Sequence, residues 1–146
     1  MPETPAEWLE SQADRTFARQ RAEVDTAKLV ATFSTGVTTT LVATSLQVGE
    51  PNGWDLTGVI LLAAAVLAVF YLILLDRITE SDQNQLLEIS KLNGWTDAQL
   101  VNELRTSMLK ATYVNTGVVT NVRRALVGQV FLSLMAGIFA CISLLR

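Results

Sequence analysis

The sequence predicts an all-α integral membrane protein with three transmembrane helices and a cytoplasmic helical bundle. Half of its 146 residues are hydrophobic, and they gather into uncharged runs of about 20 residues, the length that a helix needs to cross a bilayer. Basic residues lie almost entirely on one side of these runs. The charged segments between the runs carry helical spacing together with helix start and stop signals.

The first segment, residues 1–28, is predicted to be a cytoplasmic N-terminal amphipathic helix. Thr4 can cap the helix, Pro5 suits its first position, and Glu7 can complete a capping box. No strong helix breaker follows within this segment. We therefore expect one helix over 5–47 that continues into the first membrane span.

The three predicted spans are 29–48, 56–75 and 125–145. The second and third are uncharged and strongly apolar, whereas the first is rich in Ser and Thr and depends on its neighbours for support. Residues 49–55 contain turn-forming types and form a predicted external loop, while 76–124 form a cytoplasmic helical region. A water-soluble helical hairpin is the alternative, but three such runs exceed what a soluble core of this size can cover.

Basic residues orient the chain, because Lys and Arg are enriched in cytoplasmic segments. With the N-terminus in the cytoplasm, every basic residue except Arg146 lies on the cytoplasmic side. These residues are Arg15, Arg19, Arg21, Lys28, Arg77, Lys91, Arg105, Lys110, Arg123 and Arg124. The prediction is a multi-pass protein of the inner (plasma) membrane with its C-terminus outside.

Two helices are predicted to begin in the cytoplasmic region, and the second of them continues into the third membrane span. The first covers 78–93 and ends at Gly94, a residue type that often follows the last turn of a helix. Thr96 and Gln99 then form a capping-box pattern. No proline follows, so we expect the third long helix to extend over 97–145.

A stripe of mostly apolar residues recurs along this long helix at intervals of three and four. It consists of Val101, Leu104, Met108, Ala111, Asn115, Val118 and Val122. A polar residue such as Asn115 within a coiled-coil seam can fix register and oligomeric state. The stripe therefore either packs on the other cytoplasmic helices of one subunit or joins subunits, and a shared bundle allows both.

Polar and small residues inside the predicted spans offer two further surfaces. In the third span, Ser133, Gly137 and Cys141 recur every four residues, a pattern typical of tight helix packing, and Gln129 is a candidate for interhelical hydrogen bonds. In the first span, hydroxylated residues form two opposite strips, Thr32, Thr35 and Thr39 on one side and Ser34, Thr38 and Ser45 on the other. These strips either line a pore in an oligomer or pack against other helices.

Composition argues against several classes of function. Net charge is −3 and the chain has no histidine, so we expect no nucleic-acid partner, and the commonest general base and metal ligand is missing. The sequence contains no glycine-rich phosphate loop, nucleophile elbow or metal-ligand spacing. We therefore predict no enzymatic activity, no catalytic residue, no metal and no cofactor. No internal repeat or membrane-embedded charge favours a transporter.

The order of these segments resembles the Pycsar effector family of bacterial antiphage systems and is similar to the two-span SLATT-type effectors. In the Pycsar family an Asp-x-Lys-Ala element commonly opens the first span. Here DTAK stands at 25–28, with Lys and Ala exchanged, and VRRAL at 122–126 loosely matches the basic approach to the last span. The similarity in layout covers nearly the whole chain, although these motifs are short and imperfect.

The resemblance implies a dormant membrane effector. A cyclic nucleotide, made by a partner cyclase, would trigger a homo-oligomer or rearrangement that impairs membrane integrity. The nucleotide would bind between the cytoplasmic helices, where Lys91, Arg105, Lys110, Arg123 and Arg124 can contact phosphate, although the same residues also satisfy the orientation rule. The alternatives are a structural or adaptor protein that docks a partner through its cytoplasmic helices, and a phage holin.

Overall fold

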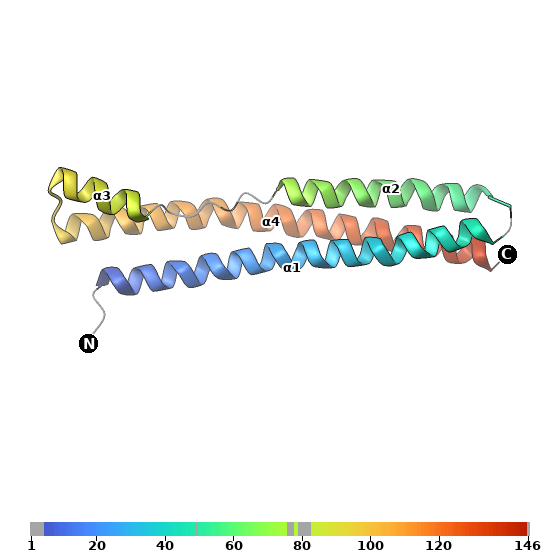
Figure 1. Ribbon diagram of the computed structural model, residues 1–146, viewed down its shortest axis with the longest axis horizontal. Coiled ribbons are helices and arrows are strands. Elements are labelled where there is room, and N and C mark those ends of the chain that lie inside the picture. The colour runs from blue at the N-terminus through green and yellow to red at the C-terminus, as the bar shows by residue number, and fades with distance from the viewer. Residues whose placement is uncertain (1–4, 49, 76–77, 79–82, 146) are drawn as a thin grey trace. The chain divides into compact units, whose positions relative to one another are not determined.

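The computed structural model describes residues 5–48, 50–75, 78 and 83–145, and in these residues it contains helices and no strand (Figure 1). The four helices are α1 (Pro5–Gln47), α2 (Gly53–Leu74), α3 (Gln83–Asn93) and α4 (Asp97–Leu144). Three of them, α1, α2 and α4, are long and apolar enough to cross a membrane. The expectation of an all-helical chain with three candidate spans is therefore confirmed.

The two long helices are continuous, as the lack of strong stop signals predicted. α1 begins at Pro5 and α4 ends at Leu144. The capping box predicted at Thr4 and Glu7 lies outside the described residues and side chains. The second capping box is present, because the Thr96 amide donates to Gln99 Oε1 at 3.0 Å and the Gln99 amide donates to Thr96 Oγ1 at 3.4 Å.

α3 ends as predicted but begins later than predicted. Gly94 adopts a φ of 61°, and the Trp95 amide donates to the Ser90 carbonyl at 3.0 Å, which closes the last turn. The predicted start at Ile78 is wrong, because Ile78 is not helical and the described helix begins at Gln83. Ser and Asp immediately precede Gln83 in the sequence, and these residue types favour a helix start over a helix interior.

α2 begins three residues earlier than the predicted span. Asn52 Oδ1 accepts hydrogen bonds from the amides of Trp54 at 2.8 Å and Asp55 at 3.2 Å, and Asp55 Oδ2 accepts one from the Asn52 amide at 3.0 Å. This reciprocal capping box draws residues 53–55 into the first turn of the helix. The expectation that they belong to a loop is therefore wrong.

The chain divides into two compact units, and α1 and α4 contribute residues to both. Unit 1 comprises residues 1–23 and 77–119, and unit 2 comprises 24–76 and 120–146. In unit 1, Ala13 and Phe17 of α1 form a buried cluster with Met108 and Ala111 of α4. Met108 and Ala111 of the apolar stripe on α4 are thus buried with residues of the chain's own first helix.

In unit 2, α2 runs alongside α4 (Figure 1). Its buried residues Gly58, Ala65 and Leu72 recur every seven positions and form one narrow strip. A Cβ atom at Gly58 would stand 3.6 Å from the carbonyl oxygen of Ala136, so the two backbones approach closely. Large apolar side chains cover the outer surface of unit 2. Examples are Leu29, Phe33, Leu56, Ile60, Leu67, Phe70, Val127 and Phe131.

Candidate functional site

A buried polar network connects α1 with α4 inside unit 2, and Gln129 is its centre. The Gln129 side chain is fully buried. Its Nε2 atom lies 2.7 Å from Thr35 Oγ1, 3.1 Å from Ser34 Oγ and 3.2 Å from the Ala31 carbonyl oxygen. An amide nitrogen has only two hydrogens, so these acceptors on α1 share them.

Two further hydroxyl groups extend the network. Gln129 Nε2 also lies 2.9 Å from Ser133 Oγ, one turn further along α4, and Ser34 Oγ donates to Gln129 Oε1 at 3.2 Å. On the next turn of α1, the buried Thr38 hydroxyl lies 2.8 Å from the Ser34 carbonyl and 3.2 Å from the Ser133 carbonyl. Polar groups of α1 and α4 thus satisfy each other where the surroundings are apolar.

The two hydroxylated strips of α1 have different surroundings. The strip of Ser34, Thr38 and Ser45 turns inward, with Thr38 and Ser45 buried and Ser34 half-buried. On the other strip, Thr32 and Thr39 are exposed and only Thr35 reaches Gln129. The inward strip therefore packs against α4, as the packing interpretation predicts, and a pore-lining role for either strip stays a prediction.

Three exposed hydroxyls in the apolar part of α1 are bonded to the helix's own backbone. Thr39 donates to the Thr35 carbonyl at 2.8 Å, Thr40 to the Gly36 carbonyl at 3.1 Å and Thr44 to the Thr40 carbonyl at 2.8 Å. Such bonds satisfy a hydroxyl donor without water or a second helix. The outer face of α1 is therefore compatible with lipid as well as with another protein surface.

The residues predicted for an oligomer seam are buried within one chain. Met108 and Asn115 lie inside unit 1, and Asn115 is fully buried. In unit 2, Ser133 and Gly137 face α1, since a Cβ at Gly137 would stand 3.6 Å from the Leu41 side chain. These residues therefore serve packing within the subunit, and an additional role between subunits stays a prediction.

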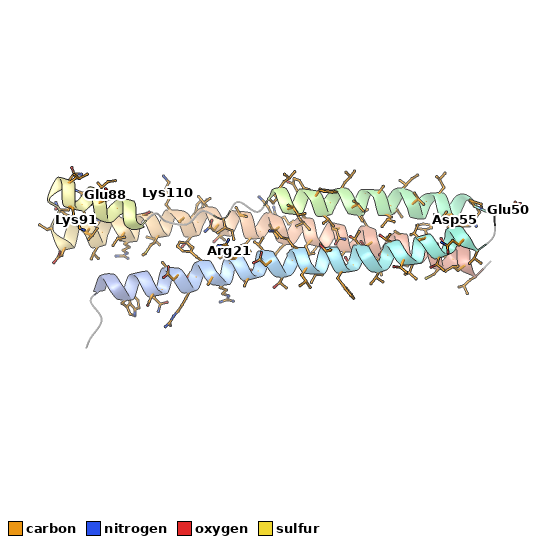
Figure 2. All side chains as sticks on the ribbon, in the orientation of Figure 1. Arg21, Glu50, Asp55, Glu88, Lys91 and Lys110 are labelled. Atoms are coloured by element: carbon orange, nitrogen blue, oxygen red, sulfur yellow. The ribbon has the colours of Figure 1, made fainter. Side chains whose placement is uncertain are left out.

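The basic residues predicted to contact an anion belong to different units. Arg105 and Lys110 belong to unit 1, whereas Arg123 and Arg124 belong to unit 2, and all four are exposed. Lys91, on α3, is exposed as well, and Figure 2 labels it together with Lys110. The nucleotide-binding role of these residues stays a prediction.

An apolar groove lies between α1 and α4 beside the polar network. It has a volume of about 570 Å³. Its lining includes Phe33, Val37, Leu41, Leu134, Ile138 and Cys141, and Ser34, Thr38 and Ser133 also reach it. Polar groups that join α1 to α4 are therefore adjacent to an open apolar surface.

A second buried polar cluster lies at the N-terminal end of α2, and it was not predicted. The Asp55 side chain is 2% exposed, and Ser45 of α1 and Ser143 of α4 are also buried. Asn52 Nδ2 donates to Ser143 Oγ at 2.9 Å and thereby ties the start of α2 to the end of α4. The spacing of Asn52 and Asp55 signals a capping box, but no sequence signal reveals that the carboxyl is buried.

Comparison with known proteins adds no relative. The chain matches no family model, and no curated protein or solved structure shows significant similarity to it.

Proposed function

We propose that the chain is a membrane effector that oligomerises and impairs membrane integrity in bacterial antiphage defence. α1, α2 and α4 cross the inner membrane, and unit 1 lies in the cytoplasm. The observation that carries the proposal is the Gln129 network, because a simple anchor has no need of polar groups buried in apolar helices. Here Ser34 and Thr35 contact Gln129 between α1 and α4, and Thr38 contacts the Ser133 carbonyl beside it.

Interhelical hydrogen bonds of this kind are weak enough for the α1 hydroxyls to exchange one partner for another. Interhelical hydrogen bonds inside membranes contribute on average about 0.6 kcal/mol each. A second copy can offer the same kinds of donor and acceptor, so the hydroxyls of α1 can exchange their partners at small cost. In the active state they line a polar path or a contact between subunits.

The continuity of α1 and α4 supports a trigger on the cytoplasmic side. Both helices contribute residues to unit 1 and to unit 2 without a break. A ligand that rearranges unit 1 therefore acts directly on the helices that carry the network. A cyclic nucleotide as the trigger rests on the resemblance of DTAK at 25–28 and VRRAL at 122–126 to the Pycsar effector family.

The test is induction of the protein in bacteria, with and without a nucleotide cyclase, while a voltage-sensitive dye reports the membrane potential. We expect depolarisation only when the cyclase is active, and no depolarisation with a catalytically dead cyclase. A membrane that stays polarised with purine and pyrimidine cyclases alike would contradict the proposal. Lysis without any cyclase would favour the holin instead.

An adaptor is the second candidate, and exposed apolar side chains in unit 1 favour it. Leu109 is 62% exposed and Tyr113 83% exposed on successive turns of α4, and Leu92 of α3 is 80% exposed. Exposed apolar patches often mark protein docking surfaces. An adaptor would leave the membrane polarised under every trigger, and Tyr113→Ser would abolish its phenotype without lowering its amount in the membrane.

A further inference from the structure

The groove between α1 and α4 is open to the outside and is lined mostly by apolar atoms. Its volume is about 570 Å³. The apolar side chains along it include Phe33, Val37, Leu41, Val130, Leu134 and Ile138. Both helices are candidate membrane spans over this stretch. In a bilayer the groove therefore faces hydrocarbon chains in place of water.

The hydroxyl groups that reach the groove are already hydrogen-bonded within the pair of helices. Ser34 Oγ lies 3.0 Å from the Ala31 carbonyl oxygen, and Thr38 donates to the Ser34 carbonyl at 2.8 Å. Ser133 Oγ accepts a hydrogen bond from Gln129 Nε2 at 2.9 Å. The described lining therefore presents carbon to a ligand, and an apolar occupant fits it best.

A positive charge stands on the same face of α4, before the groove begins. α4 is continuous here, and Arg123 precedes Val130 by seven residues and Leu134 by eleven. These separations are within about 20° of two and three full turns, so the three residues share one face. Arg123 is exposed and lies about 10 Å along the helix from Val130. The exposed Arg124 adds a second positive charge beside it.

The depth of Arg123 suits a lipid headgroup. Residues 125–144 of α4 carry no charge and form about 30 Å of helix, which is the thickness of the hydrocarbon core. Arg123 therefore lies at the boundary of the membrane, where the phosphate groups of lipids are found. A lipid whose phosphate contacts Arg123 can direct one acyl chain along the groove.

We propose that Arg123 and the groove bind one anionic phospholipid of the cytoplasmic leaflet. The phosphate contacts the guanidinium, which offers several donors to such a group, and an acyl chain lies along Phe33 and Leu134. Basic pockets between membrane helices bind anionic headgroups in this way. The lipid covers the side of α1 and α4 that a second copy would otherwise contact. The proposal depends on the proposed membrane crossing of α1 and α4 but not on the effector activity.

The test is native mass spectrometry of the full-length protein released from detergent micelles. Phosphatidylglycerol or phosphatidylcholine with the same acyl chains is added beforehand. We expect one phosphatidylglycerol per chain to stay bound at concentrations at which phosphatidylcholine does not. Arg123→Gln should weaken this binding about tenfold, because a charge-assisted contact with the phosphate is lost.

Lys28→Gln is the matched control for charge and should leave binding within about twofold of the wild type. Lys28 and Arg123 each stand six residues before a partner in the contact between Ser34 and Gln129, so they lie at a similar depth. Lys28 precedes Val37 by nine residues, or two and a half turns, which places it on the opposite side of α1 from the groove.

A second pair of variants tests the groove itself. Leu134→Trp places a larger ring in the lining and should also weaken binding of phosphatidylglycerol about tenfold. Leu67→Trp is its control, because Leu67 is 69% exposed on α2, outside the groove, much as Leu134 is 60% exposed within it. The comparison of the two lipids on the wild type needs no variant and stands even if one fails to fold.

Four results would overturn the proposal. Equal retention of the two lipids would show that charge does not select the occupant. Equal weakening by Arg123→Gln and Lys28→Gln would reduce the effect to diffuse attraction. A lipid-free dimer that Leu134→Trp dissociates would assign the groove to contact between copies. Arg146 follows the far end of the groove and lies outside the described residues, and loss of binding with Arg146→Gln alone would place the headgroup in the opposite leaflet.

Failure of the lipid proposal and failure of the effector proposal can be told apart. The mass measurement uses purified protein and needs neither a cyclase nor a membrane potential. A chain that depolarises the membrane on a cyclase signal but prefers neither lipid would retain the effector function without the lipid site. A chain that retains phosphatidylglycerol at Arg123 but never depolarises the membrane would have the lipid site alone.

Discussion

Gln129 Nε2 lies 2.7 Å from Thr35 Oγ1, and this contact joins the apolar part of α4 to the polar face of α1. Replacing Gln129 by Leu removes every bond that this amide makes to α1. We expect the folded state to lose about 1–2 kcal/mol, because several weak interhelical bonds are lost while the hydroxyls can still bond their own backbone. Reversible unfolding in lipid nanodiscs measures this loss.

Thr44→Val is the control for this substitution. Thr44 is exposed and donates only to the Thr40 carbonyl, so its loss should change stability by less than about 0.5 kcal/mol. Equal effects of the two substitutions would show that the network does not hold α1 and α4 together. The effector proposal adds that Gln129→Leu should also change the depolarisation response, whereas Thr44→Val should not.

Gly58 permits the close approach of α2 to α4, and its substitutions should depend on size. A Cβ atom fits at 3.6 Å from the Ala136 carbonyl oxygen, so Gly58→Ala should retain the wild-type Tm within about 2 °C. Gly58→Leu would drive its side chain into α4 and should lower Tm by about 5 °C or more, since overpacking costs about 1–3 kcal/mol. Gly128→Leu is the control, because nothing lies within 4 Å of a Cβ there. A similar loss at Gly128 would argue against close packing as the cause.

Asn115→Leu tests whether the α4 stripe joins subunits. Asn115 is fully buried within unit 1, so we expect the oligomeric mass in detergent to stay unchanged, as light scattering after gel filtration would show. Asn102→Leu, at an exposed position of the same helix, is the control. A change of mass that occurs with Asn115→Leu alone would assign the stripe to an interface between subunits.

Phe17 anchors the core of unit 1 together with Met108. Phe17→Ala should destabilise unit 1 by about 3–5 kcal/mol, the usual cost of removing a buried aromatic ring. Hydrogen exchange should accelerate over residues 11–23 and 97–119. Tyr113→Ala, at a residue that is 83% exposed, should leave exchange unchanged. Fast exchange in both variants would show that the cluster around Phe17 does not stabilise the unit.

Local signals in the sequence predicted most helix ends correctly. Gly94 and the pair Thr96 and Gln99 act within a few residues of the chain, so their composition suffices to place the end of α3 and the start of α4. Asn52 and Asp55 also form a local capping signal, but Asn and Asp are common in turns as well as at helix starts. The start of α2 was therefore predicted too late.

The partners of polar residues could not be predicted, because they depend on the rotation of one helix against another. The sequence places Ser34 and Thr38 on one face of a helix, yet it does not say whether that face meets lipid, water or protein. Gln129 was identified as a hydrogen-bonding residue, but its contacts with Ala31, Ser34 and Thr35 come from residues almost a hundred positions away. The burial of Asp55 has the same origin, since it requires the ends of α1 and α4 to meet the start of α2.

The groove between α1 and α4 includes Cys141, which is exposed and is the one cysteine of the chain. The unmodified protein thus has a single exposed thiol that can be labelled, and it lies in the groove beside the polar network. A spin label or fluorophore attached there senses lipid, water or a neighbouring copy without any engineered residue. Oxidation that links two copies through this thiol would trap a pair of molecules with their grooves in contact. The time at which this cross-link forms can then be compared with the time at which the membrane potential is lost.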